Sequence, residues 1–155
     1  MDRHWQKGFS FVELVITVGV ILVATTWAMP SFLRYLRTAE AQADAREVSA
    51  ILNRARQVAI KENCSITATA GTGGFTMTKG ATCSVGAGGS LILPGMTSAG
   101  LFKTSQNITL SGLASAVFSN LGNATTSGTF TLTSTKYGTT MRVIVDPSGR
   151  IWIQQ

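Results

Sequence analysis

Residue types on which most catalytic and metal sites depend are scarce in this sequence. It has one histidine, His4, and two cysteines, Cys64 and Cys83, among 155 residues. Because no histidine follows residue 4, a zinc site of cysteine and histidine ligands is excluded by inventory. For the same reason, no histidine is placed to activate a serine as in a Ser-His-Asp triad. We therefore expect no metal, no cofactor and no enzymatic activity.

Carboxylates are also few. A catalytic pair would have to come from Asp44, Glu47, Glu62 or Asp146. The first three fall on a predicted helix, where they are interpreted most simply as its solvated face. The glycine-rich segments GTGG and GAGG do not open a helix after a strand, so they do not indicate a phosphate cradle.

Charge is scarce in the second half of the chain, although the net charge is +6. From residue 63 onward there is one anion, Asp146, and there are five cations, which are Lys79, Lys103, Lys136, Arg142 and Arg150. This half is rich in glycine, threonine and serine, a composition typical of short strands and turns. It lacks the dense basic stripe of a nucleic-acid domain, and we expect it to lie outside the cytoplasm.

A long apolar run is the main feature that is present. Residues 9–33 are apolar apart from Glu13 and a few small residues. As a helix, these 25 residues would span about 37 Å, more than the roughly 30 Å of a bilayer core. The run follows Arg3, His4 and Lys7, which places the N-terminus in the cytoplasm. A cleaved secretory signal would have a shorter apolar core and a small-residue cleavage site, for which ATTWAMP is a weak candidate.

The helix is expected to extend well beyond this run. Proline lacks an N–H group, so Pro30 predicts a kink near Met29. Beyond it, apolar residues repeat at three- and four-residue steps with charges on the opposite face, which predicts an amphipathic helix over 34–62 that packs on a domain. Asn63 fits a C-terminal stop. One helix over about residues 9–62 is therefore predicted.

After Cys64 the pattern changes to a period of two. SITATA and FTMTK flank the turn GTGG and predict a hairpin. Further strands are predicted in LILPG, NITLSG, AVFSN and TFTLTS, and in the pair TMRVIVD and RIWIQ around the turn PSG, while GATCSVGAGGS is predicted to be a loop. These make six to eight short, mostly antiparallel strands, with the helix covering one face of the sheet. If this half is exported, a Cys64–Cys83 disulfide is expected; two free buried thiols are the alternative.

The segment KGFSFVEL, residues 7–14, resembles the class III signal of type IV pilins and type II secretion pseudopilins. In that family a membrane peptidase cleaves after the glycine and methylates the new N-terminal residue. The resemblance implies cleavage between Gly8 and Phe9 and N-methylation of Phe9. It also implies an α+β, pilin-like fold, in which a long helix packs on an antiparallel sheet. The expected parts are a leader (1–8), a transmembrane and assembly helix (9–33), the amphipathic half of that helix (34–62) and a periplasmic β-rich domain (63–155).

Glu13 is a charge inside the apolar run, where it would cost roughly 2.5–3.5 kcal/mol on insertion scales. The resemblance implies that it pairs with an α-ammonium during assembly, that of a neighbouring subunit or that of its own chain one turn away. A glutamate that simply complements the helix dipole is the alternative. Pro30 also falls at the family's position, and the resemblance implies local unwinding around Ala24–Pro30 inside a filament.

Two further segments, ILNRARQVAIKENCSITAT and VFSNLGNATTSGTFTLTS followed by MRVIVDPSGRIWI, resemble minor pilins and minor pseudopilins of the GspH/FimT type. The resemblance implies incorporation into a type IV pilus or a type II secretion pseudopilus, at initiation or at the tip. The implied partners are other major and minor pilins or pseudopilins, the prepilin peptidase, an inner-membrane assembly platform and the membrane itself. A membrane-anchored periplasmic protein that never polymerises is a rival interpretation.

Some FimT-like minor pilins are implicated in binding DNA for natural transformation through a G-R-x-R motif. Here Gly149, Arg150 and Ile151 are followed by Trp152 in place of the second arginine. One guanidinium of the motif is thus lost. The alternative function is DNA contact by the residues that are left, in which Arg142 and Arg150 would neutralise phosphates and Trp152 would stack on a base. The simpler interpretation is that Arg150 is a solvated turn residue and Trp152 a sheet residue.

Overall fold

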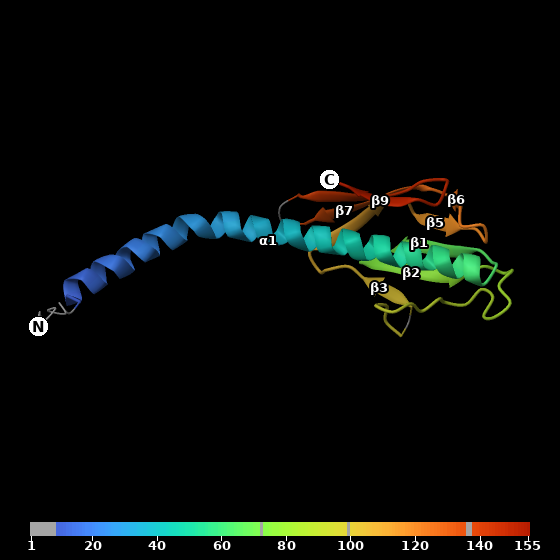
Figure 1. The fold of residues 1–155 in the computed structure, drawn as a ribbon, viewed down its shortest axis with the longest axis horizontal. Helices are drawn as coiled ribbons and strands as arrows, with labels where there is room; N and C mark the ends of the chain where they lie inside the picture. The colour runs from blue at the N-terminus through green and yellow to red at the C-terminus, as the bar shows by residue number, and fades with distance from the viewer. Residues whose placement is uncertain (1–8, 72, 99, 136–137) are drawn as a thin grey trace, which may run out of the picture. The chain divides into compact units, whose positions relative to one another are not determined.

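The computed structural model describes residues 9–71, 73–98, 100–135 and 138–155. These residues form one helix and nine strands. The chain divides into two compact units, Met1–Leu36 and Arg37–Gln155. The helix α1 (Phe11–Lys61) continues through the boundary between them, close to the predicted limits (Figure 1).

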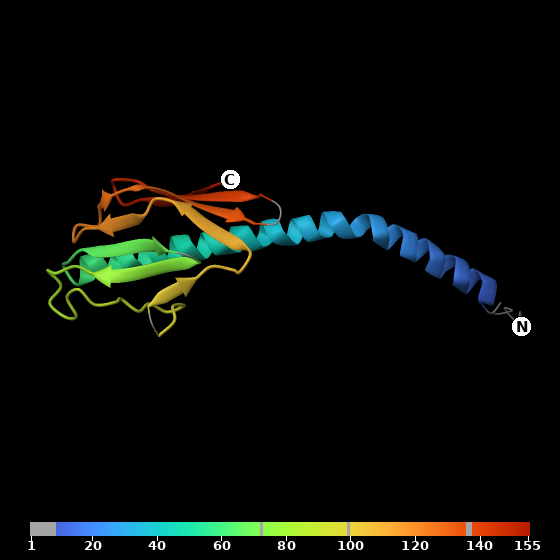
Figure 2. The same ribbon diagram turned by 180° about the vertical axis from the view of Figure 1, so that it is seen from behind.

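Within the second unit, α1 is amphipathic, as its periodicity predicts. The buried side chains recur every three or four residues and are Ala41, Asp44, Ala45, Val48, Ile51, Leu52, Ala55 and Ala59. Because four of these are alanines, this part of the helix can lie close to the strands it packs on. Figures 1 and 2 show it along one side of the β-structure.

Asn63 ends the helix by the mechanism the sequence predicts. Its φ of 51° lies in the left-handed region, which asparagine tolerates better than most residues. The Cys64 N–H donates to the Ala59 carbonyl at 3.0 Å, and the Asn63 N–H donates to the Ile60 carbonyl at 3.3 Å. These are the two bonds of a Schellman motif, and they turn the chain directly into the first strand.

The strands form two antiparallel sheets, where a single sheet was expected. The five-stranded sheet has the order β3 (Leu101–Lys103), β2 (Gly74–Lys79), β1 (Ile66–Gly71), β5 (Ser115–Phe118) and β6 (Ala124–Thr126). The four-stranded sheet has the order β4 (Ile108–Gly112), β7 (Gly128–Ser134), β8 (Thr140–Val145) and β9 (Ile151–Gln154). Both predicted hairpins, β1–β2 and β8–β9, are present.

The core lies where the helix and the inner faces of both sheets meet. Alternate residues of β7 and β8 are buried, including Phe130, Leu132 and Val143. The Phe75 ring of β2 meets the Phe130 ring edge-on, with centroids 4.8 Å apart. Since these two residues belong to different sheets, this contact helps to hold the sheets together.

The strand predicted at LILPG, residues 91–95, is wrong. Leu91 and Leu93 are buried, but the segment makes only isolated contacts with β2, such as the Leu91 N–H donating to the Met77 carbonyl at 2.8 Å. Pro94 cannot donate to a ladder, which stops the pairing there. The edge of β2 is shared instead with β3, a strand that the sequence reasoning did not identify.

Candidate functional site

The start of α1 presents a carboxylate on an otherwise apolar and exposed helix. Phe9 and Ser10 precede the helix, and the Leu14 N–H donates to the Ser10 carbonyl at 3.1 Å. Glu13 lies in the first turn, one helical turn after Phe9. Gly8, the other side of the predicted cleavage position, lies outside the described residues. The predicted cleavage therefore stays a prediction.

Glu13 has no ion-pair partner among the described residues, in which the salt bridges are Arg37–Glu40 and Lys79–Glu62. Its neighbours Val12 and Leu14 are exposed, as is every residue of the 9–36 segment. The first-turn N–H groups of a helix favour a negative charge at this position, which is the dipole interpretation. In hydrocarbon, however, the carboxylate would need a cation from outside this helix or from a newly made terminus.

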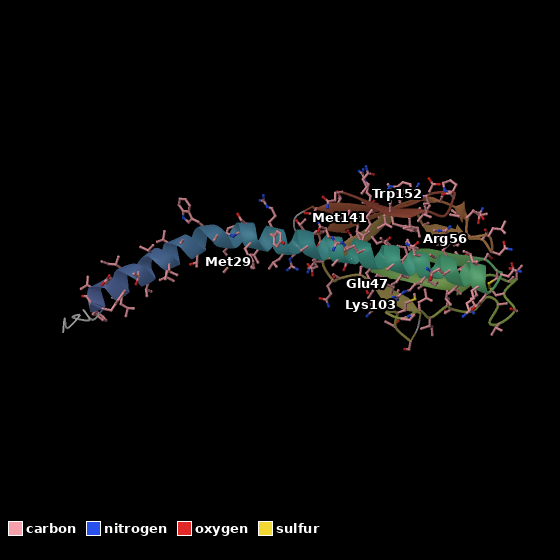
Figure 3. The ribbon with its side chains drawn as sticks, viewed as in Figure 1. Met29, Glu47, Arg56, Lys103, Met141 and Trp152 are labelled. Carbon is pink, nitrogen blue, oxygen red and sulfur yellow. A yellow bond between two sulfur atoms is a disulfide. The ribbon has the colours of Figure 1, made fainter. Side chains whose placement is uncertain are left out.

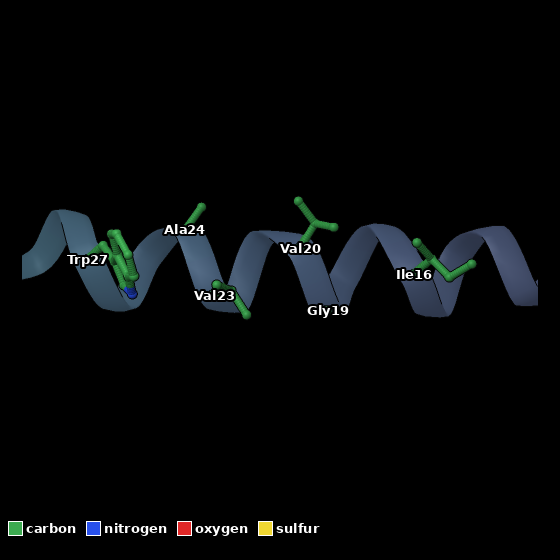
Figure 4. A pocket seen from close by; sticks show the side chains of 6 residues that line it. All are labelled: Ile16, Gly19, Val20, Val23, Ala24 and Trp27. Atoms are coloured by element: carbon green, nitrogen blue, oxygen red, sulfur yellow. The ribbon is translucent and has the colours of Figure 1, made fainter.

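The apolar part of α1 is long enough to cross a membrane and has no protein cover within its own unit. Its mean hydropathy over the best window is 2.1, and none of that window is buried. One face carries a hollow of about 550 Å³ lined by Ile16, Gly19, Val20, Val23, Ala24 and Trp27 (Figure 4). Gly19 leaves space there, because a Cβ placed on it would meet nothing within 4 Å. Such a face suits close packing by another helix, and among the six side chains that line it the indole N–H of Trp27 is the one polar group.

Pro30 does not interrupt α1, which is helical on both sides of it. Proline has no N–H, so the carbonyl four residues earlier, that of Thr26, lacks its usual donor. The Thr25 and Thr26 hydroxyls donate to the Leu22 carbonyl at 2.9 and 2.8 Å. These bonds stabilise the turn just before the missing one. Unwinding around Ala24–Pro30 stays a prediction for an assembled state.

The C-terminal end of α1 is tied to the long loop that follows β2. Cys64 and Cys83 form a disulfide, and the Lys79 ammonium lies 2.6 Å from the Glu62 carboxylate. Ligand atoms of Glu62 and the two cysteines lie within 4.8 Å of one another. They do not make a metal site as they stand, because the two sulfurs are bonded to each other and the carboxylate is paired with an ammonium.

The prediction that the helix carboxylates are solvated is wrong for Asp44, which is buried. It is only 7% exposed, and its carboxylate accepts the Ser105 N–H at 2.8 Å and the Ser105 hydroxyl at 2.9 Å. The helix is thereby fixed to the loop before β4. A signal was present in the sequence, because Asp44 falls in the same stripe as Ala41, Ala45 and Val48.

Two of the three residues of the DNA alternative, Arg142 and Trp152, lie on one face of the four-stranded sheet. Arg142 of β8 is opposite Gln154, and Ile144 is opposite Trp152 of β9. Arg142 and Trp152 are therefore diagonal neighbours on the face of the sheet opposite to the buried Val143. Figure 3 shows Trp152 on the outside of this sheet. Around them the face carries hydroxyl side chains, which are Thr109, Ser111, Thr129, Thr131 and Thr133.

Arg150 lies in the turn between β8 and β9, where its charge affects the carboxyl group of Asp146. The Ser148 N–H donates to the Asp146 carboxylate at 2.8 Å. Hydrogen bonds from the Ser148 N–H and the Ser148 hydroxyl lower the pKa of Asp146; burial opposes them, and the Arg150 charge adds the smallest lowering effect.

Comparisons with known proteins agree on one class of protein. The family model described as "Type II transport protein GspH" matches residues 44–149, well over half of the chain. The minor pilin FimU of Pseudomonas aeruginosa aligns with a TM-score of 0.54 and 19% identity, over 76% of this chain and 90% of that one. The minor pseudopilin EpsH of the Vibrio cholerae Type 2 Secretion System aligns with a TM-score of 0.57 and 14% identity, over 74% and 96%. At such low identities, the two structural alignments show a common fold and nothing beyond it. No curated protein matches the sequence.

Proposed function

Because this chain belongs to the GspH family of type II transport proteins, we propose that it is incorporated as a minor subunit into a type IV pilus or a type II secretion pseudopilus. Members of this class are structural components and not enzymes. Its apolar N-terminal helix and family membership indicate membrane anchoring with a soluble C-terminal domain. Its place in the filament is taken to be at initiation or at the tip.

Glu13 is the observation that carries this proposal. The carboxylate lies in the first turn of a fully exposed apolar helix and has no cationic partner among the described residues. If the peptidase cleaves between Gly8 and Phe9, the new α-ammonium of Phe9 lies one turn from Glu13, even after N-methylation. The same ammonium on an incoming subunit can then pair with Glu13 of a subunit already in the filament. Such a pair removes a charge that would cost roughly 2.5–3.5 kcal/mol in hydrocarbon.

The parts of the chain then have distinct roles. Residues 1–8 form the leader recognised by the prepilin peptidase and removed by it. Residues 9–33 anchor the chain in the inner membrane with its N-terminus cytoplasmic, and pack among other pilin helices after assembly. Residues 34–62 support the periplasmic domain of 63–155. The remaining partners are other major and minor subunits and the inner-membrane assembly platform.

Charge variants at Glu13 test this assignment. In Glu13→Gln and Glu13→Lys we expect normal membrane insertion but loss of incorporation, measured by membrane fractionation and by crosslinking to neighbouring filament subunits. Glu13→Asp keeps the charge and should retain part of the incorporation. Glu47→Gln, on the exposed face of the same helix, is the matched control and should behave as wild type. Normal incorporation of Glu13→Lys would refute the role given to this residue.

DNA binding remains a second candidate, because Arg142 and Trp152 share one outward face. The cations of this candidate site are Arg142 and Arg150. Two cations can supply only a weak, strongly salt-dependent affinity for DNA. A gel shift with double-stranded DNA at low salt, using wild type and Arg142→Ala, decides this candidate. A shift that is lost in the variant supports DNA binding, and no shift at low salt ends it.

A further inference from the structure

The outer face of the four-stranded sheet carries a row of polar side chains that crosses all four strands. The members of this polar row lie opposite one another in the register of the sheet, and they are Ser111 of β4, Thr131 of β7, Arg142 of β8 and Gln154 of β9. Neighbouring strands are about 4.8 Å apart, so the row extends over about 14 Å. It therefore presents hydroxyl, guanidinium and amide groups at regular intervals.

Trp152 lies beside the polar row, at the diagonal position from Arg142. Its side chain is 40% exposed, which leaves part of the indole ring open to a flat molecule lying on the row. Within the four strands, the apolar side chains on this face are Trp152 and Ile144, which lie opposite each other. The face is therefore polar with one exposed aromatic ring, and it is not an apolar patch.

The charge on this face has one sign. Arg142 is exposed and is the one cation in the four strands, which contain no aspartate or glutamate. It takes part in neither of the salt bridges found among the described residues. The Ser111 hydroxyl donates to the Thr131 carbonyl at 3.4 Å, which leaves the hydroxyl oxygen free to accept a hydrogen bond. The face thus suits a ligand that carries both an anion and hydroxyl groups.

We propose that this face binds a linear acidic polysaccharide, which is a chain of sugar rings that carry carboxylates. The Arg142 guanidinium binds a sugar carboxylate through two parallel hydrogen bonds. Ser111, Thr131 and Gln154 exchange hydrogen bonds with the sugar hydroxyls, because their side chains can both donate and accept. The C–H groups on the face of a neighbouring sugar ring, which are slightly positive, stack on the negative face of the Trp152 indole.

The chemistry of the face selects this ligand over other occupants. Double-stranded DNA depends on several phosphate contacts, and the face has one cation. A second copy placed face to face would bring two Arg142 guanidinium groups of like charge together. Serine and threonine seldom contribute strongly to protein interfaces, although most outward residues of these strands carry hydroxyl groups. Those hydroxyl groups match the hydroxyl groups of a sugar chain.

This inference does not depend on the assembly role proposed for Glu13, since the whole face belongs to the Arg37–Gln155 unit. The experiment titrates the full chain in detergent micelles with oligogalacturonate and follows binding by calorimetry. Methyl-esterified oligogalacturonate is the matched ligand, because it has the same rings without the charge. Wild type should bind the acid form about tenfold more tightly than the ester, since esterification removes the partner of Arg142.

Variants of the face separate the two contacts. Arg142→Gln should bind both ligands equally and as weakly as wild type binds the ester, because the pairing of charges is the coupled term. Trp152→Ser should lose affinity for both ligands, whereas Trp152→Phe keeps a ring and should retain most of it. Thermal unfolding of each variant checks that the domain is folded.

Lys103→Gln is the matched control, because it removes one exposed cation from β3 of the other sheet. Figure 3 shows Lys103 and Trp152 on opposite sides of the unit, and this variant should bind as wild type. The proposal is overturned if wild type does not bind the acid form, if Trp152→Ser binds normally, or if Lys103→Gln weakens binding as much as Arg142→Gln. Tighter binding of double-stranded DNA than of oligogalacturonate at the same salt would also overturn it and would assign the face to DNA.

Discussion

Replacing Asp44 by alanine should destabilise the Arg37–Gln155 unit by about 3 kcal/mol. The buried carboxylate accepts two hydrogen bonds from Ser105, one from its N–H and one from its hydroxyl. Bonds to a charged group contribute about 1.5–3 kcal/mol each, and a buried donor left without a partner costs about 1–3 kcal/mol. Alanine removes both acceptors and leaves the Ser105 N–H unsatisfied, so the loss should be large for a single polar residue.

Ser105→Ala separates the two bonds, because it removes the hydroxyl and keeps the N–H. We expect it to cost about 1 kcal/mol in wild type and almost nothing in the Asp44→Ala background, a coupling of about 1 kcal/mol. Urea unfolding of residues 37–155 measures both effects. With a slope of about 1.5 kcal/mol/M, the Asp44→Ala midpoint should fall by roughly 2 M. A loss below about 1 kcal/mol, or strict additivity of the two substitutions, would refute the reasoning.

The remaining predictions concern the disulfide, an aspartate and two glycines. Replacing Cys64 and Cys83 by serine should lower the free energy of unfolding by about 3 kcal/mol, because the disulfide joins residues that are 19 positions apart in the sequence. Thermal unfolding with and without reductant checks this, and an unchanged midpoint would contradict it. Because the pKa of Asp146 is lowered in the folded state, its stabilising effect is present above the unfolded-state pKa and is lost as pH falls through the folded-state pKa. Asp146→Asn should therefore make the free energy of unfolding depend less on pH on the acid side. An unaltered slope would argue against this. Gly149 and Gly73 both have a φ of 80°, but only at Gly149 would a Cβ collide with the Gly122 carbonyl, so alanine should cost about 1–2 kcal/mol at Gly73 and clearly more at Gly149 in urea unfolding. Equal costs would show that the close approach does not matter.

The helix was predictable because its signals are local. The apolar periodicity of residues 41–59 and the stop at Asn63 each depend on neighbours within a few positions, and the structure follows both. The β1–β2 and β8–β9 hairpins were predictable for the same reason, since a short turn fixes which strands pair.

The division into two sheets was not predictable in this way. It depends on which distant strands pair, as when β4 pairs with β7 and β1 pairs with β5. The burial of Leu91 and Leu93 without a strand has a similar origin, because β3 shares the edge of β2 with that segment. Asp44 was misjudged because its partner, Ser105, is 61 residues away in the sequence.

At the start of the chain, processing and assembly are predicted from the sequence motif and not from the fold. The order Lys7, Gly8, Phe9 and Glu13 predicts processing and assembly, while the structure adds that Glu13 lies on an exposed apolar helix without a cationic partner among the described residues. The interpretation of Glu13 as an assembly residue therefore depends on a new terminus being made beside it.

The mass of the N-terminal peptide tests this most directly. The chain is expressed with its own secretion or pilus machinery, isolated from the cell envelope, and its N-terminal peptide is sequenced by tandem mass spectrometry. The account predicts a chain that begins at Phe9 and carries one additional methyl group on its amino nitrogen. An intact peptide that still begins with Met1, in cells where other pilin-type subunits are processed, would contradict it.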